Sequence, residues 1–209
     1  MITIVSGLPR SGTSMMMRIL EAGGLPLLTD QVRVADVDNP NGYCEFEPVK
    51  TTADDSSWLA QAEGRVVKMV YKLLYDLPAN RTYHVVFLQR ALKEVVASQN
   101  RMLAHRRANE GVQTMGQSDS LTVGLSDRPT VQPALDEHTL VEAFAAEVAA
   151  CKAWLRCQPN FQVLYVNYNQ LLDAPQAHVA KINAFLGGQW NEAAMCQVVD
   201  PKLYRERRT

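Results

Sequence analysis

Several features that mark specialised classes of protein are missing from this sequence of 209 residues. The formal net charge is only −1, so no overall electrostatic field favours nucleic acid or a membrane surface as a partner. No apolar run is long enough to cross a membrane, and the chain has no internal repeat or low-complexity tract. The first apolar run begins at Ile2, so we expect no signal peptide or anchor ahead of it. These absences favour a globular, cytoplasmic protein.

The cysteines are too few and too scattered to form a metal site or a disulfide framework. Cys44, Cys151, Cys157 and Cys196 show no CxxC spacing, and no histidine pattern accompanies them. Free cysteines of this kind fit a reducing compartment. We therefore expect a fold that depends on its hydrophobic core and a function that uses no structural metal.

Short apolar runs alternate with helix-like segments along the chain. The expected strands cover residues 2–5, 66–71, 84–88 and 161–166. The expected helices cover residues 15–22, 49–62, 92–106, 138–156 and 175–187. This alternation predicts an α/β fold of the P-loop type, a three-layer sandwich whose central, mostly parallel sheet is flanked by helices. In such a sheet, ligands bind at the carboxyl ends of the strands.

One segment does not follow this alternation. Residues 108–136 are rich in Gly, Ser, Thr, Gln, Asp and Pro, with no sustained hydrophobic period. A segment of this length and composition is typical of a mobile, substrate-side insert. We expect one domain over residues 1–209 that carries this insert.

The loop between the first strand and the first helix, residues 7–14 (GLPRSGTS), predicts a phosphate site. The N–H groups and the dipole of a helix N-terminus attract anions, and Gly7 and Gly12 have no Cβ to obstruct the approach. Thr13 follows the second glycine, where a nucleotide-triphosphatase loop has lysine, so Arg10 is the only cation in the loop. The alternative is a strand–helix turn of the same shape without a ligand.

The end of the third expected strand indicates which phosphate chemistry to expect. A Mg²⁺-dependent phosphoryl transferase of this layout needs an aspartate at a strand end, whereas this strand leads into Arg90. A guanidinium binds phosphate through a fork of donors, and Ser98 stands eight positions further on, where its hydroxyl can reach the same anion. The alternatives are a surface ion pair of Arg90 with Glu94 and an ordinary helix serine.

Taken together and in this order, the motifs resemble those of the PAPS-dependent sulfotransferase family, where PAPS is 3′-phosphoadenosine 5′-phosphosulfate. The family's first motif, which cradles the 5′-phosphosulfate, matches Pro9, Arg10, Ser11, Gly12, Thr13 and Ser14. Its second motif, an arginine and a serine that hold the 3′-phosphate, matches Arg90 and Ser98. Residues 39–50 and 198–207 are also similar to bacterial-type members, so the resemblance covers nearly the whole chain apart from residues 108–136.

The sequence also departs from the family pattern. Many members carry lysine where Arg10 stands, although members resembling tyrosylprotein sulfotransferases carry arginine there. The cytosolic small-molecule members use a histidine base and a later Gly-rich lysine motif, and neither has a counterpart here. The second departure leaves the general base to be found among other residues.

The resemblance implies an enzyme that moves a sulfuryl group from PAPS to a hydroxyl or amine of a small-molecule or glycan acceptor, releasing PAP, without a metal. Arg10 is expected to stabilise the charge that develops on the leaving phosphate, and Lys68 or Lys50 to add a further positive charge. A P-loop nucleotide or small-molecule kinase is the alternative function. A non-catalytic nucleotide-binding module is the third.

Glu45 is the expected general base. The flanking Tyr43 and Phe46 would partly desolvate its carboxylate and make it a stronger base, and related enzymes use a glutamate after a similar segment. Glu47 is the alternative base. A competing role for Glu45 is to cap a helix that starts near Glu47.

Overall fold

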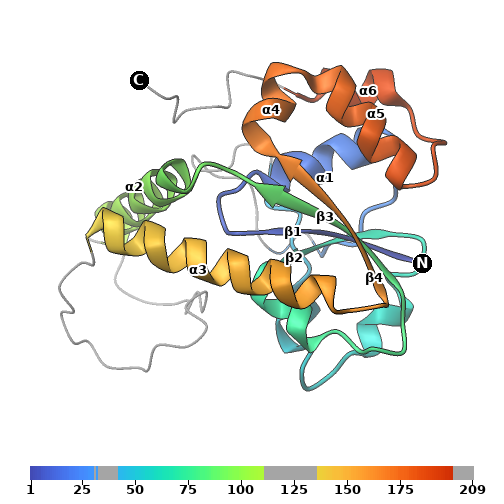
Figure 1. Cartoon of the computed structure of the whole chain (residues 1–209), viewed down its shortest axis with the longest axis horizontal. Helices are drawn as coiled ribbons and strands as arrows, with labels where there is room; N and C mark the ends of the chain where they lie inside the picture. The colour runs from blue at the N-terminus through green and yellow to red at the C-terminus, as the bar shows by residue number, and fades with distance from the viewer. Residues whose placement is uncertain (31, 33–41, 111–135, 200–209) are drawn as a thin grey trace.

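The computed structural model describes residues 1–30, 32, 42–110 and 136–199 (Figure 1). Its centre is a sheet of parallel strands in the order β2-β1-β3-β4. The strands are β1 (Ile2–Gly7), β2 (Val66–Val70), β3 (Tyr83–Gln89) and β4 (Phe161–Asn167). All four predicted strands are thus confirmed, and the sheet is parallel throughout. The predicted insert lies largely outside the described residues and stays a prediction.

Helices cover both faces of this sheet. The α-helices are α1 (Thr13–Ala22), α2 (Leu92–Glu110), α3 (Glu137–Arg156), α4 (Tyr168–Asp173), α5 (Pro175–Phe185) and α6 (Glu192–Gln197). Three short 3-10 helices, η1 (Glu47–Thr51), η2 (Ser57–Ala60) and η3 (Tyr71–Asp76), complete the described elements. No helix in the described part of the chain is long and apolar enough to cross a membrane.

Two hydrophobic cores make the structure three layers deep, as predicted. On one face, α1 and the C-terminal helices α4, α5 and α6 pack against the sheet through residues such as Met17, Leu171 and Ile182. On the other face, the 3-10 helices, α2 and α3 pack through residues such as Leu59 and Leu155. Figure 1 shows α1, α4, α5 and α6 gathered on one side and α2 and α3 running side by side beyond the sheet.

The predicted helix over residues 49–62 is wrong, because side chains in this region bond locally to the backbone. The Thr52 hydroxyl donates to the carbonyl of Val49 (2.6 Å) and accepts from the indole of Trp58 (3.2 Å). The Asp55 carboxylate accepts from the N–H of Ser57 (2.8 Å). Such bonds compete with a helical ladder, so two short 3-10 helices replace one long helix. Trp58 is nevertheless buried, as its apolar character predicts.

The carboxyl edge of the sheet gathers the segments that carry the predicted chemistry. Gly7 at the end of β1 pairs with Val70 on one side and with Leu88 on the other, and Gln89 pairs with Asn167. The loop, Arg90 and the start of α4 therefore leave the sheet side by side. The sequence predicted neither α4 nor α6, since each has only six residues and shows no clear period.

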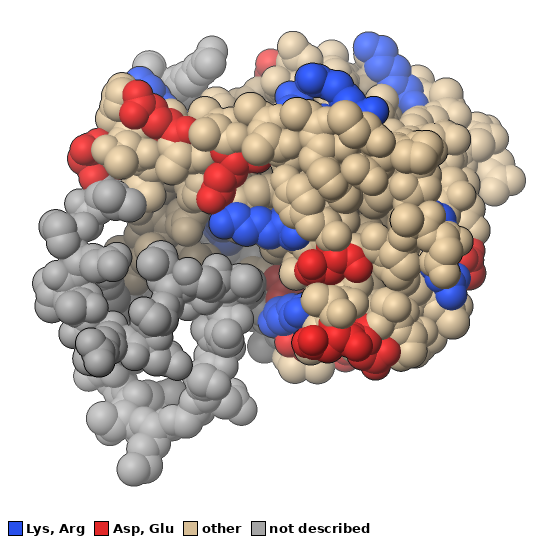
Figure 2. Space-filling model, turned by 60° about the horizontal axis from the view of Figure 1, so that its bottom comes forward, with Lys and Arg blue, Asp and Glu red and all other residues tan. Residues whose placement is uncertain are grey.

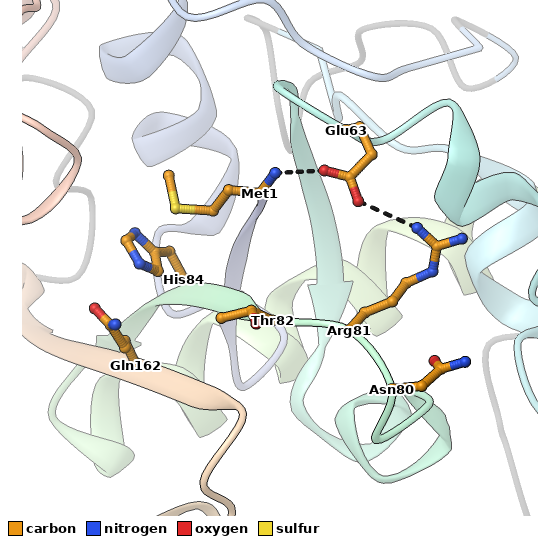
Figure 3. A pocket seen from close by; sticks show the side chains of 7 residues that line it. All are labelled: Met1, Glu63, Asn80, Arg81, Thr82, His84 and Gln162. Atoms are coloured by element: carbon orange, nitrogen blue, oxygen red, sulfur yellow. Dashed lines mark hydrogen bonds and ion pairs between the residues drawn. The ribbon is translucent and has the colours of Figure 1, made fainter.

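The opposite, amino edge of the sheet carries an open cavity of about 650 Å³ (Figure 3). The ammonium group of Met1 and the guanidinium of Arg81 both pair with Glu63 along one side. His84 and Gln162 lie on the other side. The His84 imidazole lies 5.1 Å from the ring of Phe185, centroid to centroid, and its Nδ1 has no hydrogen-bond partner among the described residues.

We expect His84 to make the fold less stable in mild acid. Burial lowers the pKa of His84 below its ordinary value of 6.5, so the folded chain takes up this proton at a lower pH than the unfolded chain does. The unfolded chain takes up the proton first as pH falls through 6.5, so the free energy of unfolding decreases below that pH. Denaturant unfolding from pH 7.5 to 5.5 should show a weaker decrease for His84→Gln than for the unmodified chain. The matched control is His138→Gln, which replaces an exposed imidazole, and an unchanged slope for His84→Gln would contradict the prediction.

Candidate anion-binding site

The loop between β1 and α1 presents the N-terminus of a helix to the carboxyl edge of the sheet. The N–H of Met16 donates to the carbonyl of Gly12 (3.0 Å), which begins the hydrogen bonding of α1. The N–H groups of Gly12, Thr13 and Met15 come earlier in the chain, at the N-terminal end of the helix. The first turn of α1 contains no acidic residue. Backbone donors and the helix dipole therefore favour an anion at this position, and the phosphate site itself stays a prediction.

Two glycines of the loop are required by their contacts. Gly12 has φ 100°, and a Cβ at this position would lie 2.3 Å from Cδ2 of Tyr168. A Cβ on Gly7 would lie 2.7 Å from the carbonyl oxygen of Leu88 on β3. The loop thus packs directly against both β3 and the start of α4, and a larger residue at either glycine would move it.

The structure brings the two predicted anion motifs together through their own side chains. Arg10 has φ 70°, and its Nε donates to the hydroxyl of Ser98 on α2 (3.0 Å). In the other direction, Nη1 of Arg90 donates to the carbonyl of Arg10 (3.2 Å). The Arg90–Glu94 ion pair considered as an alternative is present (2.9 Å), but each side chain is only 8% exposed, so it is not a surface pair. Arg90 therefore contacts the loop and Glu94 together.

Two residues at the start of α4, Tyr168 and Asn169, contact this group of side chains from a third side, and neither was predicted from the sequence. The guanidinium of Arg90 lies 4.7 Å from the ring centroid of Tyr168. The amide of Asn169 donates to both carboxylate oxygens of Glu94 (3.0 and 3.2 Å). Burial raises the pKa of the Tyr168 phenol, so this ring is a neutral surface for the cation. The sequence offered one indication of their role, namely that they directly follow a strand whose end lies at the edge where ligands bind.

Glu45 lies beside Lys68, which projects from β2. Lys68 Nζ pairs with Glu45 Oε1 (3.2 Å) and donates to the carbonyl of Tyr43, and the side chains of Lys68 and Glu45 are 11% and 16% exposed. The Ser14 hydroxyl donates to the same Tyr43 carbonyl (3.4 Å), so this segment touches the first turn of α1. The suggested capping role falls to another carboxylate, since Phe46 is the N-cap of η1 and the N–H of Glu47 donates to Oδ2 of Asp30.

The other residues predicted near this pair lie at the surface. Lys50 forms an ion pair with Glu47 (2.8 Å), and both side chains are more than one-third exposed. Two lysines were expected to add positive charge. Lys68 pairs with Glu45, the predicted base, whereas Lys50 pairs with Glu47, the alternative base. No cluster of three or more possible metal ligands occurs among the residues that the structure describes.

The charge needed to bind an anion is local to the loop edge. Figure 2 shows Lys and Arg interspersed with Asp and Glu on the face that it presents, in keeping with a net charge of −1. At the loop, by contrast, the side chains of Arg10, Arg90 and Ser98 join the N–H groups of α1 as donors. Glu94 is the carboxylate in direct contact with these groups, and it is paired with Arg90. This donor set fits two phosphate groups better than a metal ion.

The parallel sheet, the glycine-bounded loop and the two arginines at its carboxyl edge define an α/β protein of the P-loop type. A family profile described as "Sulfotransferase domain" matches residues 2–204, so the chain belongs to this family. The family uses PAPS as its sulfuryl donor, and the chain is accordingly a PAPS-dependent sulfotransferase. This finding confirms the resemblance seen in the motifs.

The chain is also similar to solved structures at low sequence identity. The sulfotransferase domain of the Synechococcus PCC 7002 olefin synthase has a TM-score of 0.50 and 16% identity, over 99% of this chain and 82% of that chain. The sulfotransferase domain from the curacin biosynthetic pathway has a TM-score of 0.48 and 16% identity, over 97% and 78%. Retinol dehydratase, solved with androsterone and the inactive cofactor PAP, has a TM-score of 0.43 and 18% identity, over 94% and 62%. No curated protein sequence matches the chain.

Gly12→Ala should disrupt the anion site, whereas Gly187→Ala should not. Both glycines have φ near 100°, so alanine at either position should cost about 1–2 kcal/mol in backbone strain. A Cβ at Gly187 meets no atom within 4 Å, but a Cβ at Gly12 collides with the ring of Tyr168. Calorimetric titration with PAP should therefore show at least about a tenfold loss of affinity for Gly12→Ala alone. Equal PAP affinities for the two variants would contradict this assignment of the loop.

Proposed function

We propose that this enzyme transfers the sulfuryl group of PAPS to a hydroxyl or amine of a small-molecule or glycan acceptor at the carboxyl edge of the sheet. In this proposal, Pro9, Arg10, Ser11, Gly12, Thr13 and Ser14 bind the 5′-phosphosulfate. Arg90 and Ser98 bind the 3′-phosphate. The observation that carries the proposal is the pair of crossed hydrogen bonds, from Arg10 Nε to Ser98 and from Arg90 Nη1 to the Arg10 carbonyl, which unites the two motifs.

The arrangement supports a donor with two separate phosphate positions. The helix N-terminus offers backbone donors, and Arg90 and Ser98 add side-chain donors from β3 and α2. The same geometry disfavours the kinase alternative. Phosphoryl transferases of this layout use a loop lysine and a strand-end aspartate, whereas none of the four described strands ends in aspartate.

Arg10 has the position expected of a residue that assists the leaving group. PAPS supplies a sulfuryl group on a good leaving phosphate, which gains negative charge as the S–O bond breaks. Ser98 accepts a hydrogen bond from Nε of Arg10 and so fixes the direction of the Arg10 guanidinium. Donors already in place at a site of developing charge lower the barrier without reorganisation.

Glu45 is the proposed base for the acceptor. The contact with Lys68 Nζ fixes the orientation of its carboxylate near the first turn of α1. A carboxylate held in this way accepts a proton from a hydroxyl or an ammonium group that approaches it. Lys68 thus orients the base by direct contact, and in this proposal its positive charge also lies near the incoming sulfuryl group.

A direct test compares nucleotides by isothermal titration. We expect PAP to bind in the presence of a chelator, and ATP with Mg²⁺ to bind more weakly, because the site has two phosphate positions and no metal-binding aspartate at a strand end. The reverse order of affinities would support the kinase. Transfer of labelled sulfate from PAPS to a broad acceptor panel then separates an enzyme from a non-catalytic nucleotide-binding module.

Arg90→Ala should weaken PAP far more than adenosine 5′-phosphate, which lacks the 3′-phosphate. Loss of a charge-assisted contact to an anion should cost about 2–3 kcal/mol, or about 30- to 150-fold in affinity. The matched control is Arg81→Ala, which removes a guanidinium paired with Glu63 at the opposite edge of the sheet. If the unmodified enzyme bound the two nucleotides equally, the 3′-phosphate would have no site and the proposal would fail.

Glu45→Gln should abolish most turnover while leaving PAP affinity intact. Glutamine keeps an oxygen for Lys68 Nζ but accepts a proton poorly, so turnover should fall about 10²- to 10⁴-fold on an acceptor found in the panel. Glu47→Gln, at the exposed pair with Lys50, is the comparison. Near-normal turnover of Glu45→Gln together with a loss for Glu47→Gln would move the base to Glu47.

A further inference from the structure

Three separate contacts within the protein hold the side chain of Arg90 in place. Its Nε pairs with Glu94, its Nη1 reaches the carbonyl of Arg10, and its guanidinium lies over the ring of Tyr168. Glu94 is in turn held by Asn169. Two of these partners, Tyr168 and Asn169, are adjacent residues at the start of α4.

The ring of Tyr168 touches both halves of the anion site. On one side it packs so closely against Gly12 that a Cβ there would lie 2.3 and 2.6 Å from two ring carbons. It also contacts the guanidinium of Arg90, 4.7 Å from the ring centroid. Tyr168 is 4% exposed, so these contacts are made away from water, where a cation–π interaction is strongest.

The position of the Tyr168 ring is itself well determined. β4 pairs with β3 through Gln89 and Asn167, so Tyr168 leaves the sheet next to Arg90. The Asn167 side chain accepts from the N–H of Gln170 (3.0 Å) and fixes the start of α4. Leu171, fully buried in the core beneath α1, anchors the same turn. The ring is therefore a rigid surface against which a flexible arginine can be ordered.

We infer that Tyr168 and Asn169 are positioning residues for the donor nucleotide, which hold Arg90 in register with the phosphate loop so that it selects a donor with a 3′-phosphate. Tyr168 acts through its ring on the guanidinium, and Asn169 acts through Glu94. Ordering the guanidinium in advance lowers the entropic cost of binding the phosphate. The inference rests on the proposed function, since it assigns Arg90 to the 3′-phosphate.

The test measures a preference, defined as the affinity for PAP divided by the affinity for adenosine 5′-phosphate. Titrations of the full chain give this ratio for each variant, and circular dichroism confirms that each variant is folded. Tyr168→Leu should reduce the ratio about tenfold, which corresponds to a desolvated cation–π contact. Tyr168→Phe retains the ring and should restore the ratio of the unmodified enzyme.

A matched control comes from β4, the strand that leads into α4. Tyr165 contacts the ammonium of Lys152, 4.9 Å from its ring centroid, and packs against Phe87 in the opposite core. Tyr165→Leu makes the same change in a comparable cation–π pair away from the loop, so it should lower stability and leave the ratio unchanged. A folded Tyr168→Leu enzyme with an unchanged ratio would overturn the inference for Tyr168 and reduce its role to packing.

Two further variants keep the inference testable if Tyr168→Leu does not fold. Asn169→Ala removes the contacts to Glu94 and should also lower the ratio, and an unchanged ratio for this folded variant would overturn the inference. In an Arg90→Ala background, Asn169→Ala should have no additional effect on the ratio, since both act through one guanidinium. An additional loss there would show that Asn169 acts elsewhere.

The outcome also separates this inference from the proposed function. If the unmodified enzyme shows no preference for PAP, both are wrong, because Arg90 then serves no 3′-phosphate. If the unmodified enzyme prefers PAP and the folded Tyr168 and Asn169 variants keep that preference, only the positioning role is wrong. Equal losses of affinity for both nucleotides count against the positioning role as well.

Discussion

The close packing of the phosphate loop against the start of α4 is the constraint on which the site depends. Gly12 approaches the ring of Tyr168 more closely than any side chain would permit, and the same ring faces Arg90. The loop, the end of β3 and the end of β4 are thereby fixed against one another at one edge of the sheet. Hydrogen bonds between the two motifs, from Arg10 to Ser98 and from Arg90 to the loop carbonyl, depend on this alignment.

The buried ion pairs at this edge fix the positions of side chains more than they stabilise the folded chain. The Arg90–Glu94 and Lys68–Glu45 pairs are largely shielded from water, where desolvation offsets much of the attraction between opposite charges. In each pair, one residue is proposed to act on the reactants and the other holds it in place. Asn169 donates a further hydrogen bond to Glu94, and the carbonyl of Tyr43 accepts one from Lys68. The sheet therefore presents a prearranged set of donors on one side and an oriented carboxylate on the other.

The sequence predicted the strands and the anion motifs because both are local patterns. Short apolar runs such as residues 84–88 and the glycines of the loop are visible without knowledge of the fold. The helix over residues 49–62 was wrong because the bonds of Thr52 and Asp55 to nearby backbone compete with helix formation. Tyr168 was missed for another reason, and so was the contact between Lys68 and Glu45, although each of these two residues was predicted to act at the site. Their roles follow from strand order, which places β2 and β4 on either side of the β1–β3 pair.

The most direct measurement is an experimental structure of the enzyme with PAP bound. The account predicts that the 5′-phosphate lies on the N–H groups of the loop before α1, with Arg10 beside it. It also predicts that the 3′-phosphate contacts Arg90 and Ser98, with the Arg90 guanidinium still against the ring of Tyr168. A 3′-phosphate that contacts neither Arg90 nor Ser98 would contradict the account.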